Sequence, residues 1–155
     1  MADILEQLLQ EEQELQFTKF NETTASRIGN QLVERAMSEN LPVTIDITRG
    51  AHQLFHASLR GTAPDNDEWV KRKVRLVYRF GHSSFYMGQL LKSKGKRIEE
   101  AYLLSENEYA PHGGCFPIII KDTGMIGTIT ISGLPQEEDH KLVVQALRNY
   151  LAQEQ

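Results

Sequence analysis

Two segments in which apolar and polar residues alternate constrain the fold of this chain most. Residues 43–48 read Val-Thr-Ile-Asp-Ile-Thr, the strict alternation expected of a strand that buries one face. Arg49-Gly50 provides a turn, and residues 51–59 provide the returning strand of a hairpin. A second hairpin is predicted over residues 116–132, with Asp122-Thr-Gly at its turn. Two hairpins predict an antiparallel sheet of at least four strands.

Helical periodicity separates and flanks the two hairpins. Asn21 is a good N-cap for a helix that should end near Asn40, because Pro42 disfavours helical geometry in the residue before it. Ser83 or Ser84 could cap a further short helix. We expect helices over residues 3–14, 22–40, 68–80, 84–91 and from 135 onward. Hairpins separated by helices indicate an α+β architecture.

Size and composition are those of an ordinary globular protein. The 155 residues suit a single domain, 1–155, in which residues 1–14 form an amphipathic N-terminal helix. The net charge of −4 argues against nucleic acid, and no apolar run is long enough to cross a membrane. The single cysteine, Cys115, excludes an internal disulfide, and the first residues do not resemble a signal peptide. We expect a cytoplasmic protein without nucleic-acid or membrane partners.

The charges are distributed unevenly along the chain. The segment 71–97 contains nine basic residues and no acidic one, so all 21 acidic residues lie elsewhere. The nine are Lys71, Arg72, Lys73, Arg75, Arg79, Lys92, Lys94, Lys96 and Arg97. On the predicted helix, most of the first five fall in one sector that faces away from the core. This basic segment serves either an anionic ligand or acidic groups of the same or a neighbouring subunit.

Three sequence elements taken together resemble a known family. They are Pro64-Asp-Asn-Asp-Glu-Trp-Val-Lys-Arg-Lys73 followed by Arg79-Phe-Gly-His-Ser-Ser84, then His112-Gly-Gly-Cys-Phe-Pro-Ile118, and finally Ile126-Gly-Thr-Ile-Thr-Ile-Ser-Gly-Leu-Pro-Gln-Glu-Glu-Asp-His140. In this order they resemble an uncharacterised branch of the haem-degrading-domain family, whose relatives include secreted haem-binding proteins and GlcG-like proteins. The resemblance implies a profilin-like fold, with an antiparallel sheet of about five strands flanked by helices, and a homo-oligomer.

The segment His112-Gly-Gly-Cys115 is the best candidate for a functional site. Its two glycines allow close approach of a ligand, and they equally suit a tight bend at the start of a strand. Arg72 and Lys73 could bind an anionic group such as a haem propionate, or could pair with the carboxylates of residues 137–139. Haem is therefore a possible cofactor. The candidate ligand-binding residues are His112, Gly113, Gly114, Arg72 and Lys73.

Other reactive side chains give weaker predictions. Cys115 either forms a nucleophilic dyad with a histidine or is simply buried. His52 and His56 share a face of the predicted strand about 13 Å apart, too far to chelate one metal ion. No spacing requires a metal, so no metal site is predicted, and no residue is assigned as catalytic.

Three functions are compatible with these observations. The first is a homo-oligomeric domain that binds a small anionic, partly apolar ligand, with a haem-like tetrapyrrole as the named example. The second is a non-catalytic assembly or adaptor protein, in which the basic helix and the acidic first helix contact protein partners. The third is an enzyme that acts on a small carbonyl or hydroxy-acid metabolite through His112. Since no catalytic set is identified, a non-enzymatic role is the leading expectation.

Overall fold

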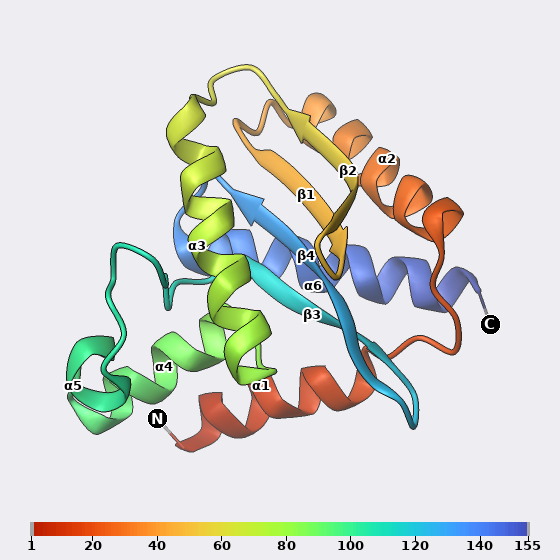
Figure 1. Ribbon diagram of the computed structural model, residues 1–155. Helices are drawn as coiled ribbons and strands as arrows, with labels where there is room; N and C mark the ends of the chain where they lie inside the picture. The colour runs from red at the N-terminus through yellow and green to blue at the C-terminus, as the bar shows by residue number, and fades with distance from the viewer. Residues whose placement is uncertain (1, 155) are drawn as a thin grey trace.

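The computed structural model describes residues 2–154, and it places one antiparallel sheet between layers of helices (Figure 1). The strands are β1 (Thr44–Arg49), β2 (His52–Ser58), β3 (Cys115–Ile120) and β4 (Gly124–Ser132). The helices are α1 (Ala2–Glu14), α2 (Glu22–Ser38), α3 (Pro64–Phe80), α4 (Ser84–Lys94), α5 (Ile98–Tyr102) and α6 (Gln136–Gln153). Both predicted hairpins are present, and the α+β class is confirmed.

The sheet contains four strands in the order β2-β1-β4-β3, each antiparallel to its neighbours. The expectation of about five strands is wrong. The extended segment after α1 makes a single parallel bridge, between Phe17 and Ile120, and the chain then enters α2 from Asn21. Since β4 pairs with both β1 and β3, the two hairpins join into one sheet.

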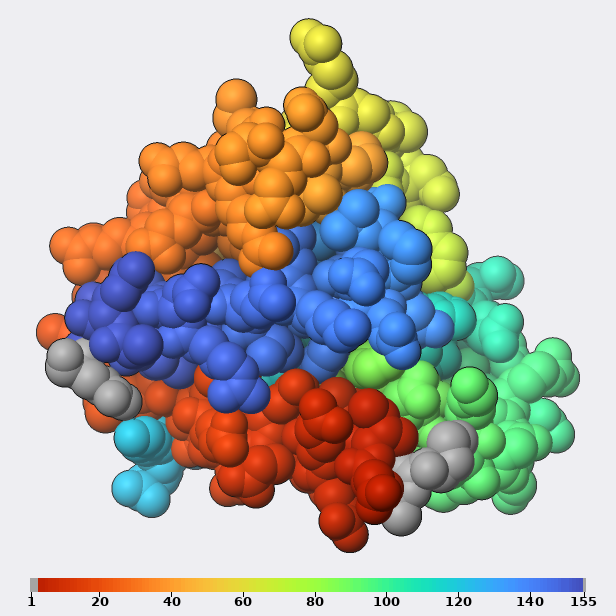
Figure 2. Space-filling model, turned by 180° about the vertical axis from the view of Figure 1, so that it is seen from behind, coloured from red at the N-terminus to blue at the C-terminus, as the bar shows by residue number. Residues whose placement is uncertain are grey.

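One face of the sheet forms the main hydrophobic core. Ile45 and Ile47 of β1 and Ile129 and Ile131 of β4 are at most 1% exposed on this face. They pack against the apolar sides of α2 and α6, which lie next to each other when the molecule is seen from behind (Figure 2). Truncating any of these isoleucines to alanine should cost about 2–5 kcal/mol.

The opposite face of the sheet is polar, and α3 covers it. Thr44, Asp46, Thr128 and Thr130 alternate with the core isoleucines and are at most 4% exposed. The hydroxyl groups of Thr48 and Thr128 lie 2.8 Å apart and satisfy each other. The prediction of a strand with one buried face is therefore wrong for β1, because its alternation separates an apolar buried face from a polar buried face.

Local signals set most of the helix ends. Asn21 Oδ1 accepts a hydrogen bond from Thr24 N at 3.1 Å, and Thr24 Oγ1 accepts one from Asn21 N at 3.2 Å, which completes a capping box. Ser83 Oγ accepts from Tyr86 N at 3.1 Å and caps α4 as predicted. Helix α3 begins at Pro64, four residues before its predicted start, since proline suits a first helical turn. The five-residue α5 was not predicted.

Two adjacent carboxylates anchor α1 to the rest of the fold. Glu11 Oε1 lies 2.9 Å from His140 Nε2 of α6. Glu12 Oε1 lies 2.8 Å from His82 Nδ1, and its Oε2 accepts a hydrogen bond from Ser83 N at 3.1 Å. Both glutamates are buried. The acidic first helix therefore turns these two charges inward and does not present them to a protein partner.

Candidate functional site

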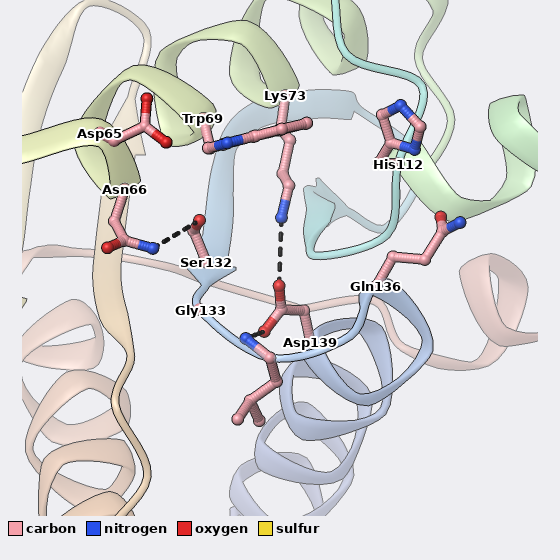
Figure 3. Close-up of a pocket in the computed structure, with 10 residues that line it drawn as sticks. Asp65, Asn66, Trp69, Lys73, His112, Ser132, Gly133, Gln136 and Asp139 are labelled. Carbon is pink, nitrogen blue, oxygen red and sulfur yellow. Dashed lines mark hydrogen bonds and ion pairs between the residues drawn. The ribbon is translucent and has the colours of Figure 1, made fainter. Parts of the chain in front are cut away.

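The loop that precedes β3 places His112 at a cavity of about 300 Å³. The cavity lies between the first half of α3, the end of β4 and the first turn of α6 (Figure 3). Lys73 and His112, two of the predicted site residues, both line it, together with Trp69 and Gln136. The fold thus brings together residues that lie almost 40 positions apart in the sequence.

Lys73 extends from α3 to the floor of this cavity and is only 3% exposed. Its ammonium group donates to the carbonyl oxygen of Ile131 at 3.1 Å and lies 3.3 Å from Asp139 Oδ2 on α6. The other oxygen of Asp139 accepts a hydrogen bond from Leu134 N at 2.9 Å. Of the two partners considered for Lys73 from sequence, a ligand anion or a carboxylate of residues 137–139, the structure contains the second.

Burial opposes the charge on each of these groups. It lowers the pKa of Lys73 and raises the pKa of Asp139 to about 6, although each member of the pair favours the charged form of the other. Burial also lowers the pKa of His112, and the positive charges of Lys73 and Arg72 lower it further. At neutral pH, His112 is therefore a neutral imidazole that can accept a hydrogen bond or coordinate a metal ion.

The two glycines after His112 serve close packing. Gly114 has a φ of +136°, and a Cβ there would lie 2.3 Å from Ile131 O and 2.6 Å from Lys73 Nζ. A Cβ on Gly113 would lie 2.3 Å from Gln136 O, and Gly113 N donates to Gln136 Oε1 at 2.9 Å. Both glycines thus bring the loop onto β4 and α6. Neither lines the cavity, so the geometry agrees with the tight-bend interpretation.

Arg72 does not line the cavity either. Its guanidinium group lies 4.5 Å over the ring of Trp69, and its Nε donates to the carbonyl oxygen of Glu106 at 2.9 Å. Arg75 likewise donates to the carbonyl oxygen of Glu108 at 2.9 Å. The basic stripe of α3 therefore holds the loop that follows α5, and Arg72 helps to position the indole of Trp69.

A second cavity, of about 270 Å³, shares His112 and Gln136 with the first. Three basic residues of the segment 71–97 line it, along with one acidic residue. These are Lys92, Lys96, Arg97 and Glu106. The second cavity therefore has an excess of positive charge, and His112 lies between it and the first cavity.

Cys115 is fully buried at the start of β3. Burial raises the pKa of its thiol to about 12, so the thiol stays protonated at neutral pH. Ser84 Oγ accepts a hydrogen bond from Cys115 N at 3.0 Å and fixes this end of the strand. The burial interpretation of Cys115 therefore fits the structure, and the nucleophilic dyad does not.

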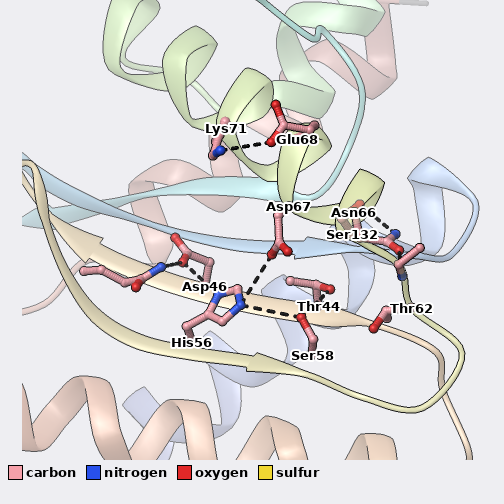
Figure 4. Close-up of polar contacts among 12 residues, drawn as sticks. Thr44, Asp46, His56, Ser58, Thr62, Asn66, Asp67, Glu68, Lys71 and Ser132 are labelled. Atoms are coloured by element: carbon pink, nitrogen blue, oxygen red, sulfur yellow. Dashed lines mark hydrogen bonds and ion pairs between the residues drawn. The ribbon is translucent and has the colours of Figure 1, made fainter.

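A separate polar cluster lies between β1, β2 and the start of α3 (Figure 4). His56 is placed between two carboxylates, with Nδ1 3.3 Å from Asp46 Oδ1 and Nε2 3.3 Å from Asp67 Oδ1. Gln53 Nε2 donates to the same oxygen of Asp46 at 2.6 Å. Within residues 2–154, no group of three or more histidine, cysteine, aspartate or glutamate side chains is arranged to hold a metal ion.

The prediction that His52 and His56 share a strand face is wrong. The register between β1 and β2 shifts after Ile47, which pairs with Phe55, whereas the next residue of β1 pairs with Gln53. This bulge reverses the alternation along β2, so that Gln53 and His56 reach the same carboxylate. His52 therefore lies on the other face of the sheet.

Sequence reasoning missed two residues of the site. Trp69 is not among the residues expected to bind a ligand, but its ring packs edge-on against the His112 imidazole, with 5.6 Å between centroids. Gln136 follows Pro135 in the first turn of α6, where only the charged residues were considered. The one available signal was that Trp69 is the single tryptophan of the chain and lies inside a motif of the suspected family.

Comparison with known proteins identifies the family. The family described as "Haem degrading protein HbpS-like" matches residues 20–148. The chain belongs to the HbpS-like family. This HbpS-like protein is 44% identical over 152 residues to a UPF0303 protein of Streptomyces coelicolor, covering 98% of this chain and 96% of that relative. It is 47% identical over 154 residues to a UPF0303 protein of Rhizobium etli, covering 99% and 93%. The resemblance inferred from the motifs is confirmed.

Solved structures share the fold of this HbpS-like protein. The crystal structure of Ybr137w has a TM-score of 0.90 and 36% sequence identity, covering 97% of this chain and 88% of that one. The crystal structure of HbpS has a TM-score of 0.65 at 17% identity, covering 88% and 92%. A PduOC:heme complex has a TM-score of 0.65 at 18% identity, covering 80% and 89%. At such identities, the last two similarities establish the fold alone.

Proposed function

We propose that this HbpS-like protein binds a small organic anion at His112. The observation that carries the proposal is the position of His112 between two cavities, one of which is lined by three basic residues. The acidic groups of the ligand would lie among the side chains of Lys92, Lys96 and Arg97. The neutral imidazole of His112 and the amide of Gln136 would contact its remaining polar atoms.

The charges of the two cavities support this orientation of the ligand. In the first cavity, Asp139 compensates the charge of Lys73, and Asp65 adds a further negative charge. The first cavity therefore has no unpaired cation to attract an anionic group. In the second cavity, the basic residues outnumber the single acidic one, Glu106. Lys73 then contacts the uncharged part of the ligand rather than its anionic end.

The size of the cavities supports a ligand of metabolite size. Small-molecule sites usually enclose about 300–1,000 Å³; the first cavity is at the lower limit of this range and the second is slightly below it. A ligand that spans both would pass the wall formed by His112 and Gln136. A short molecule with one or more carboxylates meets these conditions.

Haem meets some of these conditions and not others. His112 is a suitable axial ligand, and the nearby basic residues suit propionate groups. However, the first cavity is lined by polar side chains such as Asn66, Lys73 and Asp139, whereas a tetrapyrrole needs an apolar slot. The donor groups therefore fit haem and the enclosed space does not. A smaller carboxylate is the better match to this chain.

The fluorescence of Trp69 gives a direct test, because the chain has no other tryptophan and this one lines the first cavity. We expect a saturable change in emission on titration with citrate and a weaker response in Lys92→Ala/Lys96→Ala. The matched control is Lys19→Ala/Lys121→Ala, which removes the same charge from exposed positions away from His112 and should bind like the wild type. Equal affinity in all three proteins would contradict the proposal.

Titration with haemin tests the larger ligand in parallel. A saturable Soret shift that disappears in His112→Ala would show that haem uses the same histidine. A Soret shift that persists in His112→Ala would place haem elsewhere. Neither result depends on the citrate titration, so the two ligand classes are tested separately.

A homo-oligomer is a second proposal, and an edge strand supports it. β2 lies at one end of the sheet and pairs only with β1 among the described residues 2–154. An unpaired edge can accept a strand from another copy of the chain. Sedimentation velocity should give a species larger than the 17.7 kDa monomer. A single monomeric species at high protein concentration would reject this proposal.

Within residues 2–154, no helix is long and apolar enough to cross a bilayer.

A further inference from the structure

The amine of Lys73 lies beside a cavity, which an ion pair with a purely structural role does not require. A lysine that only joined two helices would need no cavity next to its nitrogen, yet Lys73 lines the first cavity. In Figure 3 its nitrogen lies between the side of the cavity formed by Asn66 and Ser132 and the side formed by His112 and Gln136. A small molecule in the cavity would therefore meet this nitrogen directly.

Gly114 in the loop before β3 packs closely against the nitrogen. A Cβ at this position would lie 2.6 Å from Lys73 Nζ, so a larger residue there would displace the amine. The ammonium group has three N–H bonds, and two have acceptors, the carbonyl oxygen of Ile131 and the carboxylate of Asp139. One N–H is therefore available to a molecule in the cavity.

The partner of Lys73 can also take up its proton. Asp139 Oδ2 lies 3.3 Å from the nitrogen, and both side chains are buried. Burial lowers the pKa of the amine and raises that of the carboxyl group, so both shifts reduce the free-energy cost of proton transfer from Lys73 to Asp139. The uncharged amine that results is a nucleophile.

We propose that Lys73 forms a reversible imine with the carbonyl carbon of a small 2-oxo acid bound in this cavity. The choice of an acid as the substrate rests on the anion site proposed above. Imine formation by the amine of Lys73 is argued independently of that site. The carbonyl group would lie at Lys73, and the carboxylate bonded to it would lie beside His112 and Gln136, on the wall shared with the cavity of Lys92 and Lys96.

The step balances without an added oxidant or reductant. Asp139 accepts one proton from the ammonium group, the amine nitrogen attacks the carbonyl carbon, and the C–N bond forms. A second proton moves from nitrogen to the former carbonyl oxygen and gives a carbinolamine. Asp139 then returns its proton to this oxygen, the C–O bond breaks and water leaves. Two ammonium hydrogens leave in the water, and the third stays on the iminium nitrogen, which again faces a carboxylate.

Trapping with borohydride tests the proposal on the wild-type protein. The protein is incubated with pyruvate, reduced with sodium cyanoborohydride, digested, and analysed by mass spectrometry. We expect the reduced adduct on Lys73 to form several-fold faster than on exposed lysines such as Lys121, because burial lowers the pKa of Lys73 and leaves more of its amine uncharged at a given pH. Acetone, which lacks the carboxylate, should label Lys73 more slowly than pyruvate does.

Two further measurements complete the test. Lys73→Met should lose the adduct at this position and keep labelling of the exposed lysines, with circular dichroism to verify its fold. Labelling of Lys73 no faster than that of Lys121 would overturn the proposal. The citrate titration of Trp69 fluorescence reports separately on the anion site, so failure of imine formation and failure of anion binding can be distinguished.

Discussion

Lys73 on α3 and Asp139 on α6 form a buried ion pair, with 3.3 Å between Nζ and Oδ2, at the floor of the cavity that His112 lines. The pair connects two helices that start on opposite sides of the sheet. Its position next to a cavity makes it a functional candidate, because buried pairs with shifted pKa values concentrate at functional sites.

Removal of one partner of this pair should be strongly destabilising. Lys73→Met leaves the carboxylate of Asp139 buried without its countercharge, for which we expect a loss of about 3–5 kcal/mol in the free energy of unfolding. Urea denaturation measures this loss. In the double variant Lys73→Met/Asp139→Asn, the total loss should be smaller than the sum of the two single losses. Additive losses would show that the two side chains do not interact.

Gly114→Ala should destabilise the protein by more than about 2 kcal/mol, since it adds a steric clash to a strained φ of +136°. A Cβ at this position would lie 2.3 Å from the carbonyl oxygen of Ile131. Gly95→Ala is the matched control, because Gly95 also has a positive φ but a Cβ there would meet nothing within 4 Å. Its cost should be about 1–2 kcal/mol. Thermal denaturation distinguishes the two, and equal losses would argue against the close packing of the loop.

The contact between Glu12 and His82 should make stability depend on pH. The hydrogen bond that His82 Nδ1 donates to the Glu12 carboxylate raises the pKa of His82 above its ordinary value of 6.5. A histidine whose pKa is raised on folding stabilises the folded state. This contribution is complete at pH values below the pKa of the unfolded chain, and it is lost as the pH rises through the pKa of the folded state. Glu12→Gln should therefore reduce stability more at about pH 5.5 than at about pH 9.

An NMR titration of His82 checks the cause of this dependence. In Glu12→Gln, the pKa of His82 should fall toward 6.5, because the glutamine keeps the size of the side chain and loses its charge. An unchanged His82 pKa in this variant would mean that another group raises it.

Cys115 should resist thiol reagents in the folded protein. It is buried, and its thiol has a pKa of about 12, so the reactive thiolate is scarce at neutral pH. Ellman's reagent should react slowly with the native protein and rapidly after unfolding in guanidinium chloride. Rapid reaction of the native protein would contradict the burial of this residue.

The sequence predicted the elements of the fold because local signals determine them. The alternation of residues 43–48 and the capping residue Asn21 act within a few positions of themselves, and both were interpreted correctly as strand and N-cap. The covering of the polar sheet face by α3 depends on tertiary packing, which alternation does not encode. The bulge opposite Ile47 places His52 and His56 on different faces of the sheet. No residue type near this position predicts a bulge from the sequence.

The candidate site was predicted in part for the same reason. His112 and Lys73 were chosen by chemistry and do line one cavity, whereas Arg72 turns to Glu106 and the glycines serve packing. The charge of the basic segment was visible in the sequence. Only the structure shows that the basic residues of α3 contact a loop, whereas Lys92 and its basic neighbours line a cavity.

The most direct test of the central claim is the response of the His112 imidazole to citrate, measured by ¹H–¹⁵N NMR of the histidine side chains. Anion binding between the two cavities predicts a saturable shift of the His112 resonances, with the exposed His52 unchanged. The shift should require a higher citrate concentration in Lys92→Ala/Lys96→Ala. Resonances of His112 that stay unchanged at saturating citrate, or that shift no more than those of His52, would contradict the claim.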